Sequence, residues 1–101
     1  MTDADPEFDA VHPSGHIMFR SCRGGYLHSV ALSEGAMSTD AESLARGILL
    51  TAEVSYLKAL MEVRSEIVAA GHTPSAEVPS ATDLTAASAL LAEHRLPRRE
   101  P

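Results

Sequence analysis

The sequence predicts an α+β fold: a three-stranded antiparallel meander packed on one long helix, followed by a short C-terminal helix. Three observations predict it. Gly24-Gly25 separates two segments of alternating residues, which is typical of a β-hairpin. Residues 40–70 contain no proline and carry apolar side chains at helical spacing. Residues 81–95 repeat that spacing after a linker that contains two prolines.

Length and composition indicate one domain. We place it at residues 8–96, between a flexible acidic tail at 1–7 and a flexible tail at 97–101. The net charge of −6 disfavours binding to nucleic acid phosphates, which attract Lys and Arg. The single cysteine cannot form an internal disulfide, which fits a reducing compartment.

The same composition lacks targeting and membrane signals. The acidic start has no apolar run of the kind that a secretory signal needs. Glu53 and Lys58 interrupt the best candidate for a membrane span. We therefore expect a cytoplasmic protein that does not enter a membrane.

Three short strands are expected before the long helix. Residues 8–12 predict the first, and Pro13-Ser14-Gly15 predicts a turn. Residues 16–23 and 26–32 predict the other two, joined by a two-residue turn in which both glycines have positive φ. This turn predicts four cross-strand pairs: Arg23 with Tyr26, Ser21 with His28, Phe19 with Val30, and Ile17 with Leu32. A three-residue loop would shift the pairing by one residue and scatter the apolar side chains over both faces.

The long helix has recognisable ends. Thr39 as N-cap and Glu42 three residues later fit a capping box. Gly71 is a suitable C-terminal cap, so the helix covers about 31 residues and about 46 Å. The alternative is a helix kinked near Gly47 or broken near Ser55 that folds back into a closed monomer.

The long helix carries two apolar stripes, which need two packing partners. The first stripe consists of Ala41, Leu44, Ala45, Ile48, Ala52, Ala59, Val63, Ile67 and Ala70. The second stripe consists of Leu50, Val54, Leu57, Met61 and Val68. The sheet can cover one stripe. The second helix, opened by Ser80 with Asp83, can cover part of the other. We predict that the rest of the second stripe contacts a second copy of the chain or another protein.

The reactive side chains of the hairpin region do not predict a chemical site. His16 and Cys22 are expected on one strand face about 20 Å apart, and His28 on the opposite face. Zinc needs about four ligands within about 2.3 Å of the ion, so these residues and His12 do not predict a metal site. A Cys22–His28 nucleophilic pair fails for the same reason. We expect no catalytic residues, no cofactor, no small-molecule substrate and no enzymatic activity.

The order of motifs resembles one group of bacterial proteins. F-x-x-V-x-P at 8–13 precedes the run GGYLHSVALS at 24–33, then Met37-Ser38 and LARGIL at 44–49. This order is similar to small, mainly mycobacterial proteins associated with ESX (type VII) secretion, of the EspD and EspH kind. More distantly it resembles the YbaB/EbfC fold, in which long helices that dimerise flank a short antiparallel sheet.

The resemblance implies a function. It implies a non-enzymatic adaptor or chaperone-like protein, linked to type VII secretion, that acts through dimer or partner contacts of its long helix. An accessory role is expected because Tyr26 and Tyr56 are not followed at the fourth position by the acidic residue of a type VII export signal. The alternative is a nucleoid-associated DNA-binding protein of the YbaB/EbfC type.

Overall fold

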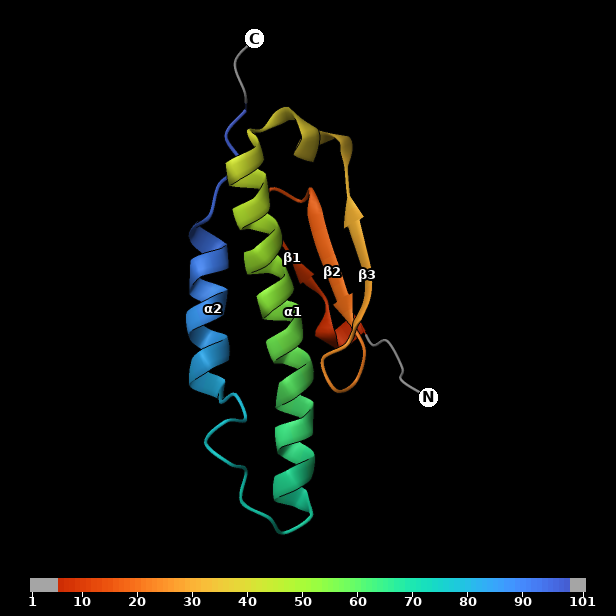
Figure 1. The fold of residues 1–101 in the computed structure, drawn as a ribbon, viewed down its shortest axis with the longest axis vertical. Helices are drawn as coiled ribbons and strands as arrows, with labels where there is room; N and C mark the ends of the chain where they lie inside the picture. Colours follow the sequence, from red (N-terminus) through yellow and green to blue (C-terminus); the bar gives the residue numbers. More distant parts are fainter. Residues whose placement is uncertain (1–5, 99–101) are drawn as a thin grey trace.

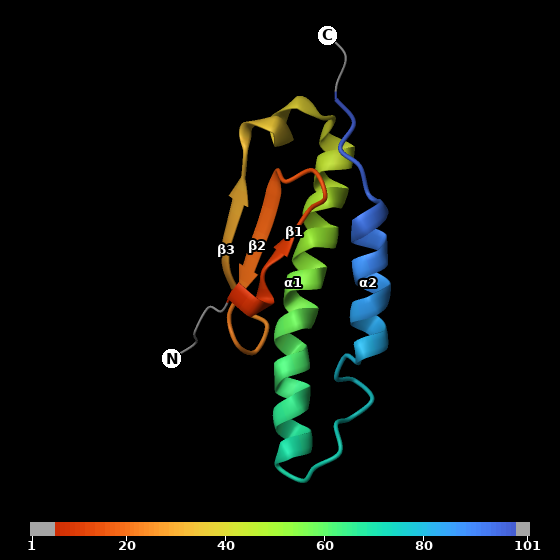
Figure 2. The ribbon, with the colours of Figure 1, turned by 180° about the vertical axis from the view of Figure 1, so that it is seen from behind.

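The computed structural model describes residues 6–98, and it confirms the predicted α+β fold. The elements are a 3₁₀ turn η1 (Pro6–Phe8), strands β1 (Ala10–Val11), β2 (Ile17–Ser21) and β3 (Leu27–Leu32), a 3₁₀ helix η2 (Glu34–Ser38), and helices α1 (Ala41–Ala69) and α2 (Ala81–Glu93). The antiparallel sheet has the order β1-β2-β3. Helix α1 lies between the sheet and α2, and its C-terminal end extends past the hairpin loop (Figure 1). Figure 2 shows the same layers from behind.

The hairpin differs from the prediction at its loop. The two-residue turn is wrong, because the amide of Cys22 donates to the carbonyl of Tyr26 at 2.6 Å and encloses the three residues 23–25. The predicted Arg23–Tyr26 and Ser21–His28 pairs are therefore absent, and Ser21 lies opposite Leu27.

A β-bulge in β3 restores the predicted register over the rest of the hairpin. Arg20 pairs with Ser29 while Ser21 pairs with Leu27, so His28 has no residue opposite it. This extra residue on β3 offsets the extra residue in the loop. The predicted pairs of Ile17 with Leu32 and Phe19 with Val30 are confirmed, and the apolar side chains stay on one face.

Helix α1 is a single continuous helix, so the kinked or broken alternative is wrong. Its N-cap is Asp40 rather than Thr39, because a carboxylate oxygen of Asp40 accepts the Ser43 amide at 2.8 Å. The hydroxyl of Thr39 instead donates to the carbonyl of Pro97 at 2.5 Å. At the other end Gly71 caps the helix as predicted, with φ +85°.

Small residues let α1 approach β2 closely. Gly47, Thr51, Ser55 and Ala59 follow one another at four-residue intervals and are all buried. The Ser55 hydroxyl donates to the carbonyl of Phe8 at 2.7 Å and lies 2.6 Å from the Ser21 hydroxyl. Four strand steps from residue 17 to 21 cover about 13 Å, and eight helix steps from 47 to 55 cover about 12 Å. Residues 47–55 of α1 and residues 17–21 of β2 therefore cover nearly the same length and lie side by side.

Helix α2 completes the core on the β1 side of the molecule. Its start is the predicted capping box of Ser80 and Asp83, and it ends at Glu93, slightly before the predicted residue 95. Leu91 is its buried anchor. It packs in one cluster with Ala10, Leu50 and Val54, flanked by the partly buried Leu84 and Ala87.

The predicted tails fall mostly outside the described residues. Residues 1–5 of the acidic tail and residues 99–101 of the C-terminal tail are not described. Within residues 6–98, neither helix combines the length and apolar character that crossing a bilayer requires.

Candidate functional site

The predicted interface stripe is divided by the fold. Leu50, Val54 and Leu57 are 8%, 3% and 3% exposed. Leu50 and Val54 pack against Leu91, so α2 covers this part of the second stripe, as the sequence allowed. Met61 is half-buried and Val68 is exposed, and both line a shallow groove at the end of α1. Their contact with a partner stays a prediction.

A second group of exposed apolar side chains lies on the other side of α1, beside β3. Every residue of β3 is exposed, although Val30 and Leu32 share a sheet face with the buried Phe19 and Ile17. The reason is that α1 lies over β2, and α2 covers only the side of α1 that faces β1. No described element covers the β3 side (Figures 1 and 2).

Helix α1 extends this surface. Gly25 of the hairpin loop lies against Tyr56, where a Cβ would come within 2.8 Å of the ring. Leu49 precedes Tyr56 by seven residues, about two helical turns, so both side chains lie on the β3 side of α1. Both are exposed. We call Leu27, Val30 and Leu32 of β3 together with Leu49 and Tyr56 of α1 the β3 flank.

The β3 flank also contains an open sheet edge. β3 is the last strand of the sheet, so one row of its backbone N–H and C=O groups has no neighbouring strand within residues 6–98. Its sequence, LHSVAL, has no proline and no Lys, Arg, Asp or Glu. Proteins usually protect such edges with charges or prolines, and an unprotected edge is a template for pairing with another strand.

Both arginines of the hairpin, Arg20 and Arg23, have carboxylate partners. Arg20 donates to both oxygens of Asp9 at 2.7 and 2.8 Å, which lowers the pKa of that carboxyl below its usual value. Arg23 pairs with Glu66 of α1. Both cations are thus partly neutralised within the chain, which weakens the case for a nucleic acid interface on the hairpin.

A buried histidine joins the two ends of the domain. His12 is 1% exposed, and its Nδ1 accepts the Ser14 amide at 3.0 Å and lies 2.8 Å from the Ser14 hydroxyl. Its Nε2 lies 2.9 Å from Nδ1 of His94, just beyond α2. Because Nδ1 accepts, the ring proton belongs on Nε2, which donates to His94. Burial lowers the pKa of His12, with a further contribution from His94.

No signal in the sequence predicts the contact between His12 and His94. The two histidines are 82 residues apart and no spacing connects them. Of the residues weighed for metal binding, Cys22 is buried and His28 is exposed in the bulge. No group of three His, Cys, Asp or Glu side chains in the described part of the chain is placed to hold a metal ion.

Comparisons with known proteins identify relatives without assigning an activity. The model of a family described as "Protein of unknown function (DUF2694)" matches residues 1–97. The uncharacterized proteins Rv0028 of Mycobacterium tuberculosis and Mb0029 of Mycobacterium bovis are each 71% identical over 99 residues, covering 98% of both chains. No solved structure matches the chain.

Proposed function

We propose that this chain, which belongs to the DUF2694 family of proteins of unknown function, is a non-enzymatic adaptor that binds protein through its β3 flank, with a second copy of itself as partner. The observation that carries the proposal is the uncovered β3, whose apolar side chains and backbone edge are both available. The proposed setting is cytoplasmic and linked to type VII secretion, as the sequence resemblance implies.

A second copy suits this surface because the surface is self-complementary. Two β3 strands that pair antiparallel about a two-fold axis bring the same apolar side chains together from both sides. Pairing Val30 opposite Val30 of the second copy keeps the inner faces of both sheets on the same side, because paired residues share a face. Both α1 helices then lie on that side, and Leu49 and Tyr56 of each copy border the junction.

The absence of charge on the strand strengthens this choice of partner. Two copies of a chain with a net charge of −6 repel each other, and a neutral contact surface keeps this repulsion low because it adds no close like-charge pairs. β3 provides such a surface, since its six residues carry no Lys, Arg, Asp or Glu. Burying Val30 and Leu32 would contribute about 1 kcal/mol or more each.

The oligomeric state tests the proposal. Sedimentation equilibrium should give about twice the monomer mass of 10.7 kDa. Val30→Lys should give a monomer, because it places a charge inside the paired sheets. Val11→Lys is the matched control: Val11 is 53% exposed and Val30 48%, but Val11 lies on β1 at the other edge. It should remain a dimer.

Two results would reject the proposal. One is a wild-type chain that stays monomeric at all accessible concentrations. The other is a Val30→Lys chain that dimerises as well as wild type while circular dichroism shows both chains folded. A mobility shift with DNA at physiological salt would favour the YbaB/EbfC alternative instead, which the net charge and the paired Arg20 and Arg23 disfavour.

A further inference from the structure

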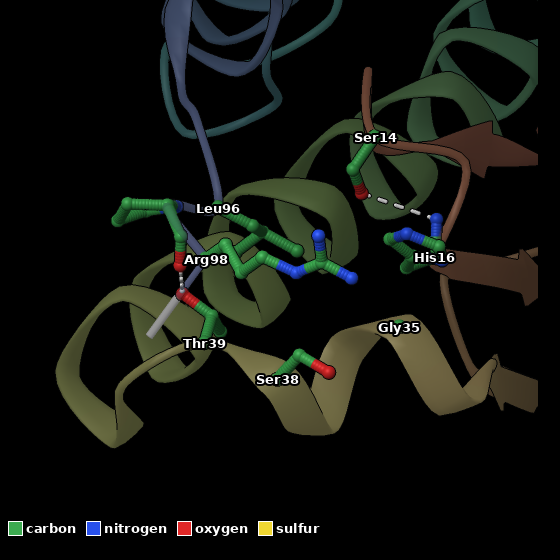
Figure 3. A pocket seen from close by; sticks show the side chains of 8 residues that line it. Ser14, His16, Gly35, Ser38, Thr39, Leu96 and Arg98 are labelled. Atoms are coloured by element: carbon green, nitrogen blue, oxygen red, sulfur yellow. Dashed lines mark hydrogen bonds between the residues drawn. The ribbon is translucent and has the colours of Figure 1, made fainter. Parts of the chain in front are cut away.

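A pocket of about 230 Å³ lies where the C-terminal segment meets the start of the sheet and η2. Three segments form its polar lining: Ser14 and His16 from the turn between β1 and β2, Ser38 at the end of η2, and Arg98 from the segment after α2. Figure 3 shows the guanidinium of Arg98 directed across the pocket toward His16. This site is separate from the β3 flank.

The pocket lining contains a cationic side chain, Arg98, although the chain as a whole is acidic. None of the residues that line it is Asp or Glu. Arg98 forms no ion pair or hydrogen bond with any described residue, whereas Arg20 and Arg23 both have carboxylate partners. The nearby carboxylate of Asp40 is occupied at the N-cap of α1 by the amide and hydroxyl of Ser43. The guanidinium therefore lacks a protein counter-ion within residues 6–98.

The polar groups around Arg98 are held in place. His16 is hydrogen-bonded through Nδ1 to the Ser33 hydroxyl, and its ring lies so close to Gly35 that any Cβ there would clash with it. Nε2 of His16 has no protein partner among the described residues, and it carries the ring proton and can donate to an anion when the Ser33 hydroxyl donates to Nδ1. The Thr39 hydroxyl holds the carbonyl of Pro97 at 2.5 Å, which fixes the residue before Arg98.

Of the remaining hydroxyl groups, Ser38 adds a donor, whereas Ser14 gives its single proton to Nδ1 of His12. The Ser14 hydroxyl lies 2.8 Å from Nδ1 of His12 and accepts the His16 amide at 3.1 Å. Ser38 makes no side-chain hydrogen bond within the described chain, and its hydroxyl can donate to a ligand. Arg98, His16 and Ser38 thus present donors to one small space from three sides.

We propose that this pocket binds a small phosphate-bearing anion, of the phosphate-monoester class. A guanidinium donates two parallel hydrogen bonds to two oxygens of such a group. The donors from His16 and Ser38 approach from other directions, which suits the remaining oxygens of a tetrahedral phosphate better than a planar carboxylate. The proposal departs from the expectation that the protein has no small-molecule ligand.

Titration with inorganic phosphate, followed by ¹H–¹⁵N NMR of the full chain, tests the proposal. Shifts should saturate and should centre on the amides of Ser14, His16, Ser38 and Arg98. Arg98→Gln should weaken binding by about tenfold or more, because a hydrogen bond to a charged group contributes about 1.5–3 kcal/mol. Arg95→Gln is the control, since Arg95 does not line the pocket and donates to carbonyls at the end of its own helix.

Specific outcomes would overturn the assignment. Shifts that rise linearly without saturation would show that no site exists. Equal phosphate affinities of wild type and Arg98→Gln would show that the guanidinium does not bind the anion. Acetate binding as tightly as phosphate at matched ionic strength would reject the phosphate class. A monomeric wild-type chain that still binds phosphate would reject the proposed adaptor dimer and leave this site intact.

Discussion

Leu91 is the one buried side chain of helix α2, and replacing it should measure how much this residue contributes to the packing of α2 on the domain. Leu91 is 6% exposed and packs with Ala10, Leu50 and Val54. Leu90, its neighbour on the same helix, is 52% exposed. The two residues have the same side chain and the same helical context, so Leu91→Ala and Leu90→Ala form a matched pair that differs in burial.

The structure sets the expected magnitude. Leu91→Ala removes about three carbon groups from a nearly dry site, which costs about 2 kcal/mol in transfer free energy. The cavity left among Ala10, Leu50 and Val54 raises the loss in free energy of unfolding to about 3 kcal/mol. Leu90→Ala should change it by about 0.5 kcal/mol or less, because alanine is also the better helix former.

Urea unfolding followed by circular dichroism at the helical signal measures both variants. In thermal unfolding followed by the same signal, a loss of about 3 kcal/mol should lower the melting temperature by about 12 °C or more in a domain of this size. Equal losses for the two variants, or a larger loss for Leu90→Ala, would show that α2 does not dock through Leu91. The cover over Leu50 and Val54 would then need another explanation.

Two further predictions concern buried polar groups. Since burial lowers the pKa of His12 below its usual 6.5, the unfolded chain binds more protons below that pH. The contribution of His12 to the free energy of unfolding should therefore be fully present above pH 6.5 and fall as the pH drops below it, and His12→Gln should reduce this pH dependence in urea titrations. Ser55→Ala should cost about 1–3 kcal/mol in the same assay, because it leaves the carbonyl of Phe8 without its 2.7 Å donor. Ser65→Ala, at an exposed position of the same helix, should leave the free energy of unfolding nearly unchanged. Equal losses of this free energy at Ser55 and Ser65 would contradict a stabilising buried hydrogen bond.

The elements of the fold were predictable because their signals are local. A proline-free periodic segment, a glycine with positive φ at its end and the Ser80–Asp83 capping box each act within one helical turn. The cross-strand pairs of Ile17 and Phe19 followed from the need to keep apolar residues on one face. The fold class and most boundaries therefore emerged from short stretches of sequence.

The hairpin loop and the N-cap of α1 were less predictable, because for each the local sequence fits two alternatives almost equally well. Thr39 and Asp40 are both good N-caps, and the choice depends on Pro97, which occupies the Thr39 hydroxyl. A three-residue loop by itself would shift the cross-strand pairs of the hairpin by one residue. A bulge at His28 restores that register, and no local signal announces the combination.

The candidate sites depended almost entirely on tertiary structure. Sequence determined that α1 carries more apolar surface than a small sheet can cover, since periodicity counts side chains without their neighbours. Tertiary structure decided that α2 covers Leu50 and Val54, that β3 stays open, and that His12 meets His94. The physical reason is range: helix and strand preferences act between residues a few positions apart, whereas burial and pocket formation depend on which distant segments come to lie together.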